Sequence, residues 1–164
     1  MAHTTWMGCV LAPDGLVYFV PYEGIFVGVF DPVTSLFSLV GPTISGDKKY
    51  WGGVLAPNGL IIFAPYSSDN VGVFEPATAN FSTVDIGDVM TVRFSGGVLA
   101  PDGQIYFVPR QAQDVGIFNP VTRVYSTAGV SVSGTWKYVG GVLAPNSQIV
   151  FVPAGADNTP KPEP

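Results

Sequence analysis

A basic residue stands directly before an aromatic residue at three points of the sequence, and the three pairs are 44 residues apart. A cation beside aromatic rings can hold an anion by charge or a sugar by stacking. The alternative is that each cation lies over its neighbouring ring and seals the end of a structural unit. With two tryptophans next to the pairs, the candidate ligand-binding residues are Lys49, Tyr50, Trp51, Arg93, Phe94, Trp136, Lys137 and Tyr138.

Few other residues have types and spacings suited to chemistry. The single histidine, His3, lies at the N-terminus and is a poor candidate for a catalytic base. No cluster of histidine, cysteine or carboxylate has metal-ligand spacing, and no nucleophile motif or phosphate-binding glycine loop occurs. The single cysteine, Cys9, stands where the other repeats carry glycine, so we expect a buried small residue there. We therefore expect no catalytic residue, no metal and no cofactor.

These residues belong to a sequence repeat with a fixed period. A proline in the segment VLAP returns every 44 residues without insertion or deletion, at Pro13, Pro57, Pro101 and Pro145. A period in the forties that is rich in strand-forming residues is typical of the blades of a β-propeller. The repeat therefore predicts an all-β fold built from 44-residue blades.

Each period contains four short strands, which in the second repeat span residues 50–57, 60–66, 70–76 and 81–86. Gly52 and Gly53 begin the first strand, which should lie nearest the propeller axis, where backbones crowd. The glycines of the third strand, Gly28, Gly72 and Gly116, are expected to admit an aromatic ring from the adjacent blade. The recurrent phenylalanine that ends the third strand, such as Phe74, is expected in the core.

The segment VLAPDGQIYFVPRQAQDVGIFNPVT resembles the YVTN family of β-propeller repeats, and the blade layout is also similar to that of WD-repeat and NHL propellers. The resemblance covers residues 6–153. It implies blade architecture and binding, scaffolding or surface roles, and it names no activity.

The repeats predict about three and a half blades per chain. The propeller should occupy residues 1–153, with blades beginning near residues 6, 50, 94 and 138, and a disordered, proline-rich tail should follow at 154–164. The first two strands of the repeat occur four times in the sequence, but the last two occur only three times. The sheets at the two ends of the array are therefore expected to have open flanks. We expect these flanks to carry Val10, Phe19, Ile149 and Phe151. A homo-oligomer, most simply a homodimer sharing one ring, would cover them. A different oligomer or a chain cut from a longer parent are the alternatives.

Composition limits the partners and function. The chain is 47% hydrophobic and 12% charged, with a formal net charge of −5, which argues against nucleic acid. No signal peptide or membrane-spanning segment is visible, so we expect a soluble protein of unknown location. The sequence favours a non-enzymatic binding or scaffold module that assembles into a closed ring, with a protein or carbohydrate ligand. A lectin with one site per blade is the alternative. An enzyme is disfavoured because the expected axis residues are glycine, valine and alanine.

Overall fold

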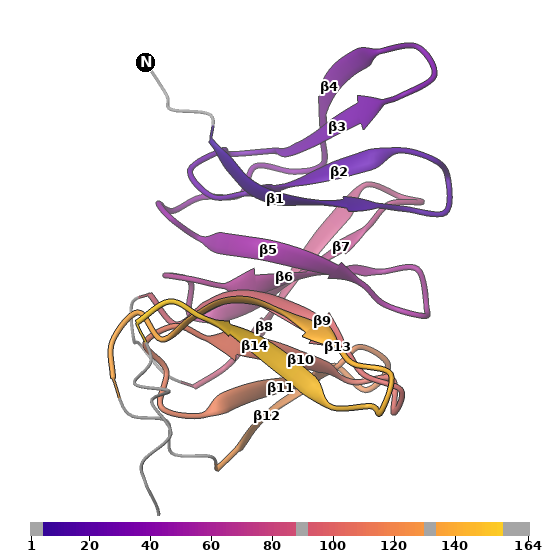
Figure 1. The fold of residues 1–164 in the computed structure, drawn as a ribbon. Helices are drawn as coiled ribbons and strands as arrows, with labels where there is room; N and C mark the ends of the chain where they lie inside the picture. Colours follow the sequence, from indigo (N-terminus) through magenta and orange to yellow (C-terminus); the bar gives the residue numbers. More distant parts are fainter. Residues whose placement is uncertain (1–4, 88–91, 130–133, 156–164) are drawn as a thin grey trace, which may run out of the picture.

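The computed structural model describes residues 5–87, 92–129 and 134–155, and within them every regular element is a β-strand (Figure 1). The first sheet comprises β1 (Trp6–Leu11), β2 (Val17–Pro21), β3 (Val27–Asp31) and β4 (Leu36–Val40). The second comprises β5 (Tyr50–Leu55), β6 (Ile61–Pro65), β7 (Asn70–Glu75) and β8 (Asn80–Asp85). The third comprises β9 (Phe94–Leu99), β10 (Ile105–Pro109), β11 (Val115–Asn119) and β12 (Val124–Ala128). The fourth comprises β13 (Tyr138–Leu143) and β14 (Ile149–Pro153).

Each sheet is an antiparallel meander in which strands follow chain order. The register is the same in every repeat, since Leu11 pairs with Val17 and Leu55 pairs with Ile61. The predicted all-β fold of four-stranded blades is therefore confirmed. The predicted tail at 154–164 lies outside the described residues from position 156 onward.

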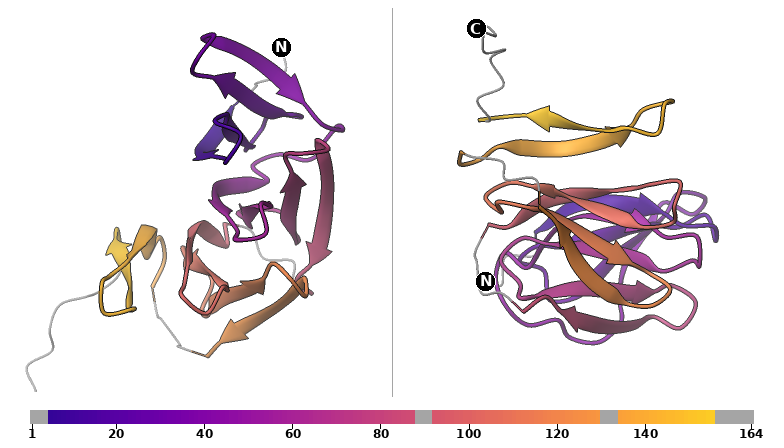
Figure 2. Two further views of the ribbon diagram at one scale, coloured as in Figure 1. Left: turned by 90° about the vertical axis from the view of Figure 1, so that its right-hand side faces the viewer. Right: turned by 90° about the horizontal axis from the view of Figure 1, so that it is seen from below.

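The four sheets follow one another along an arc, with β1, β5, β9 and β13 side by side on its inside (Figure 2). Glycine permits this close approach, because a Cβ on Gly52 would lie 2.9 Å from the Cα of Gly96. Gly52 also has a φ of +79°, which side chains other than glycine rarely adopt. The predicted crowding of backbones at the innermost strand is confirmed, and the arc is part of a β-propeller.

The third-strand glycines admit rings from their own blade. A Cβ on Gly72 would lie 3.0 Å from both Tyr50 and Phe63, which belong to β5 and β6 of the same sheet. The prediction that the ring comes from the adjacent blade is wrong. The first strand of the same meander crosses close enough for its aromatic residue to reach the third strand.

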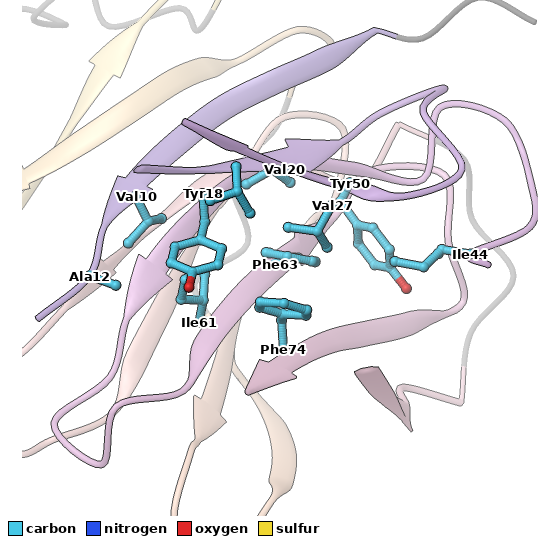
Figure 3. Packing of buried hydrophobic residues seen from close by; sticks show 11 residues of the cluster. Val10, Ala12, Tyr18, Val20, Val27, Ile44, Tyr50, Ile61, Phe63 and Phe74 are labelled. Atoms are coloured by element: carbon cyan, nitrogen blue, oxygen red, sulfur yellow. The ribbon is translucent and has the colours of Figure 1, made fainter. Parts of the chain in front are cut away.

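Hydrophobic cores fill the two junctions among the first three sheets. The first core joins valines of the first sheet, such as Val10 and Val20, to Phe63 and Phe74 of the second (Figure 3). A second core joins the second and third sheets in the same manner. Phe74 is fully buried, as predicted. In both of these junctions, an aliphatic face of one blade packs against an aromatic face of the next.

The two ends of the arc leave one face of each kind uncovered. Phe19 and Phe37 lie on the outward face of the first sheet, where their rings are 5.9 Å apart. Val142 and Val150 form a cross-strand pair on the outward face of the fourth sheet, and both are exposed. The expected open flanks exist, and Phe19 lies on one of them.

Three of the residues assigned to the flanks face the other way. Val10 is buried in the first core. Ile149 and Phe151 line a hollow between the third and fourth sheets. The prediction for these three residues is wrong because successive strand residues alternate between faces, and the sequence did not show which face meets the next blade.

The prediction that Cys9 is buried is also wrong, since its side chain is exposed. The equivalent Gly53 explains the difference: a Cβ there would lie 2.9 Å from Val20 and 3.0 Å from Val10 of the preceding blade. No described blade precedes Cys9, so a larger side chain fits.

Among the described residues, no helix is long and apolar enough to cross a membrane.

Candidate ligand-binding face

The candidate residues lie at the end of the arc where the inner strands begin. Tyr50, Phe94 and Tyr138 are the first residues of β5, β9 and β13, and each follows its basic neighbour directly. The second strand of each blade ends at the same edge, because it is antiparallel to the first. One face of the arc therefore collects residues from the beginning of each inner strand and from the segment after each second strand.

The three basic side chains are buried in this face and hydrogen-bond to backbone carbonyl oxygens. The Nζ of Lys49 donates to the oxygens of Gly46, at 2.7 Å, and Tyr22, at 3.3 Å. The Nζ of Lys137, which is fully buried, donates to the oxygen of Gly134 at 3.3 Å.

Arg93 extends the pattern across a blade junction. Its Nη1 donates to the oxygen of Ser68, at 3.2 Å, in the preceding blade. The side chains of Lys49 and Arg93 therefore link successive blades, whereas that of Lys137 bonds within its own loop.

Burial lowers the pKa of both Lys49 and Lys137, and for Lys49 the nearby Asp47 and Glu23 oppose this shift.

A backbone ladder links the blades along the same face. The N–H of each basic residue donates to the residue after the second strand of the preceding blade, and its carbonyl accepts from the matching residue of its own blade. The successive bonds run from Lys49 to Tyr22 at 2.8 Å, Tyr66 to Lys49 at 2.8 Å, Arg93 to Tyr66 at 2.7 Å, Arg110 to Arg93 at 2.9 Å, Lys137 to Arg110 at 2.9 Å and Ala154 to Lys137 at 2.8 Å. This ladder fixes the spacing of the blades at the face.

The aromatic members of the predicted set occupy unequal positions. Tyr50 and Phe94 are buried in the two cores. Tyr138 is half-buried against Phe151, with ring centroids 5.4 Å apart. Trp136 is 48% exposed. Ligand binding by the eight residues stays a prediction, and Trp136 is the one member of the set whose side chain is exposed.

Arg110 is a residue of this face that the sequence reasoning missed. Its guanidinium carbon lies 4.7 Å from the ring centroid of Trp51 and 4.3 Å from that of Trp136, so the group is held between two indoles. Only 8% of Arg110 is exposed. Its Nε and Nη1 are closed off from solvent and have no hydrogen-bond partner in the described part of the chain. A buried, unpaired guanidinium is costly unless something compensates its charge, and here the indole faces do so in part.

Two tyrosines extend the cluster toward the first blade. The ring centroid of Trp51 lies 5.2 Å from that of Tyr66 and 5.9 Å from that of Tyr22. Burial raises the pKa of the Tyr22 hydroxyl, with smaller contributions from Tyr66 and Glu23.

A signal for this cluster was present in the sequence. Tyr22, Tyr66 and Arg110 are 44 residues apart, and each directly follows the proline that ends the second strand. The same position thus carries a large side chain in three repeats. We name Tyr22, Tyr66, Trp51, Arg110 and Trp136 the aromatic cluster.

The face has no arrangement for metal binding among the residues that the structure describes, where no three histidine, cysteine or carboxylate residues come together. His3 lies outside the described residues. Arginine between indole rings can bind an anion or stack beside a sugar.

The fold and this face define the class of the protein, which is a partial β-propeller. No family model matches the chain, and no curated protein sequence matches it. Among solved structures, the virginiamycin B lyase of Staphylococcus aureus is similar, with a TM-score of 0.79 and 16% identity over 93% of this chain and 50% of that one. A chain of a nidogen/laminin complex has a TM-score of 0.69 and 17% identity over 93% of this chain and 58% of that one. An auxiliary nutrient binding protein of Bacteroides ovatus has a TM-score of 0.66 and 14% identity over 92% of this chain and 36% of that one.

These likenesses show the fold alone, and the chain spans about half the length of the lyase. They correct the prediction that the protein is not an enzyme, because the same arrangement of blades occurs in a lyase. That prediction considered only the small residues of the inner strands. Functional groups on propellers can instead be carried by the loops that the strands position.

Proposed function

We propose that the chain is a binding module that closes a propeller ring with a second copy and holds its ligand on the aromatic cluster. Membership in the YVTN repeat family is part of this proposal. The observation that carries it is the complementarity of the two open ends, since one end presents an aromatic face and the other an aliphatic face.

The inner junctions supply the model for closure. Between the first and second blades, Val10 and Val20 pack against Phe63 and Phe74. The equivalent open faces carry Val142, Val150 and Val152 at one end and Phe19, Phe30 and Phe37 at the other. A second copy placed head to tail would repeat the inner packing at both ends, and such a closed contact covers both flanks at once.

The backbone ladder has matching ends. It begins at Thr5, whose oxygen accepts from the N–H of Tyr22, and it runs to the N–H of Ala154. In the inner junctions, the residue equivalent to Ala154 accepts a hydrogen bond from the N–H of the residue equivalent to Thr5. The same bond between Ala154 of one copy and Thr5 of the next would continue the ladder across the closing junction.

Cys9 sets one difference between the closing junction and the inner ones. The equivalent glycines lie against valine side chains of the preceding blade and leave no room for a Cβ, which at Gly53 would lie 2.9 Å from Val20. The thiol of Cys9 must therefore hold the closing junction further apart than the inner junctions.

Cys9 also provides the test of closure. As the single cysteine, it can be labelled with a maleimide, and we expect labelling to slow as protein concentration rises and the second copy covers the thiol. Val142→Asp should keep labelling fast at all concentrations, because it puts a carboxylate into the apolar contact. Val121→Asp, at an even more exposed valine in a turn, is the matched control and should behave like the parent. Labelling that is independent of concentration in the parent would contradict closure.

Carbohydrate binding is a second candidate function, favoured by the exposed indole of Trp136 beside Trp51 and Arg110. Aromatic faces can stack on sugar rings, and the guanidinium would favour acidic sugars. A glycan array should then give hits among uronate-bearing glycans, and Arg110→Met should remove them. An array without hits would leave protein ligands as the class to search.

A further inference from the structure

The fourth sheet has an uncovered edge. Among the described residues, β14 pairs with β13 on one side and has no strand on the other. In the other three sheets, the second strand pairs with a third on that side. An unpaired strand edge offers a row of backbone donors and acceptors to an incoming strand.

Two hollows follow this edge. One, of about 520 Å³, lies between the third and fourth sheets and is lined by Tyr106, Val115, Ala128, Ile149 and Phe151. The other, of about 490 Å³, follows β14 itself and is lined by Tyr138 and residues 148–151. An apolar wall on one side and a free strand edge on the other suit a β-strand that adds its side chains to the core.

We propose that β14 is the docking edge for a β-hairpin of the same type as β7–β8, supplied by another polypeptide. The complete blades specify how it would bind. In β6–β7, Ile61 pairs with Phe74 and Phe63 pairs with Gly72. Ile149 and Phe151 occupy the positions of Ile61 and Phe63, so the incoming strand places a phenylalanine opposite Ile149 and a glycine opposite Phe151.

The glycine of the incoming strand, opposite Phe151, determines which hairpins can bind. In the second blade, a Cβ at Gly72 would meet Tyr50 and Phe63 at 3.0 Å, and in the third a Cβ at Gly116 would meet Phe94 at 2.8 Å. The fourth sheet presents the same kind of ring pair. The centroids of Tyr138 and Phe151 are 5.4 Å apart, against 5.6 Å for Tyr50 and Phe63. An incoming strand with a side chain at this position would collide with these rings.

The second strand of the hairpin fills the outer part of the hollow. In the third blade, Phe118 of β11 and Tyr125 of β12 pack in the core with Val71, Val73 and Val84 of the preceding blade. Val115 and Ala128 line the same kind of surface on the third blade, facing the fourth. The guest is thus an amphipathic hairpin with Val-Gly-aliphatic-Phe in its first strand and an aromatic residue in its second.

A synthetic peptide with the sequence of residues 70–86 tests the proposal on the whole chain. We expect it to bind and to protect the backbone amides of β14 from hydrogen exchange. The same peptide with Gly72→Val is the matched control and should bind at least tenfold more weakly. Equal binding of the two peptides, no binding of either, or protection at sites other than β14 would overturn the proposal.

The site does not depend on ring closure, because the free edge of β14 has no neighbouring strand among the residues that the structure describes. Repeating the measurement on the Val142→Asp variant separates the two ideas. Peptide binding should persist in this variant even though its end face is disrupted, since Val142 lies on the outward face of the fourth sheet. Loss of peptide binding in this variant, with the variant still folded, would overturn the placement of the hairpin on β14.

Discussion

The second and fourth blades carry the same segment of the repeat in different surroundings. Ile62 and Val150 hold one repeat position, yet Ile62 is fully buried and Val150 is 51% exposed. Ala64 and Val152 hold another, with exposed fractions of 0% and 48%. In the described part of the chain, the second blade has a neighbouring blade on both faces, whereas the fourth has one on a single face. Burial in this molecule is therefore set by the neighbouring blade, as expected for an array whose units cannot bury their faces alone.

The largest effect is expected from removing a ring at an inner junction. Phe74→Ala should lower the free energy of unfolding by about 3–5 kcal/mol, because the buried ring leaves a cavity beside Tyr18 and Phe63. Phe30→Ala changes the same repeat position in the first blade, whose ring is only partly buried. Under dilute conditions, Phe30→Ala should therefore lower the free energy of unfolding by clearly less than Phe74→Ala does. Urea unfolding curves measure both values, and equal losses would show that the two blades are covered alike.

A smaller difference is expected at the inner-strand glycines. Gly52 and Gly140 both have positive φ, so alanine at either position should cost about 1–2 kcal/mol of backbone strain. Gly52→Ala should cost more than this, because its Cβ would meet the backbone of Gly96 at 2.9 Å, whereas nothing lies within 4 Å of a Cβ at Gly140. Thermal unfolding of the two variants under dilute conditions, where no second copy covers the ends of the arc, compares them. A Gly140→Ala variant as unstable as Gly52→Ala would mean that this end of the arc is already occupied.

The smallest effect concerns two tyrosines that bond to turn carboxylates. The hydroxyl of Tyr18 donates to Asp14 at 2.8 Å and that of Tyr106 donates to Asp102 at 3.0 Å. The pKa of Tyr18 is raised, mainly by burial at an inner junction, and that of Tyr106 is raised mainly by its hydrogen bond.

A raised pKa means that the folded chain keeps these protons where the unfolded chain, with a tyrosine pKa of about 10, loses them. The stabilisation is present below about pH 10 and is lost as the pH rises above it. Tyr18→Phe should flatten the alkaline fall of the unfolding free energy more than Tyr106→Phe does. Denaturant unfolding between pH 9 and about 11.5 measures the slopes, and identical slopes in the two variants would contradict the difference in burial.

The comparison of blades also explains how far the sequence could be interpreted. The 44-residue period and the turn prolines were enough to predict the strands, since these depend on local patterns that recur. The assignment of Val10 to an open face failed, because alternation along a strand does not say which face meets the next blade. The burial of Cys9 was predicted from the glycines of other repeats, whose environment includes a preceding blade that Cys9 lacks.

The candidate face shows the same limit. The recurrence of Lys49, Arg93 and Lys137 identified positions that matter, but the side-chain bonds of Lys49 to Tyr22 and of Arg93 to Ser68 cross to the preceding blade and depend on how blades stack. The place of Arg110 between Trp51 and Trp136 requires three blades to meet. No single repeat contains that information.

The mass of the protein in solution tests ring closure most directly. Light scattering across the micromolar range should return twice the 17.3 kDa of one chain, because two copies cover both open faces. The Val142→Asp variant should return the mass of one chain under the same conditions, while Val121→Asp should remain at twice that mass. A well-behaved single chain of 17.3 kDa across that range in the parent protein would contradict the account.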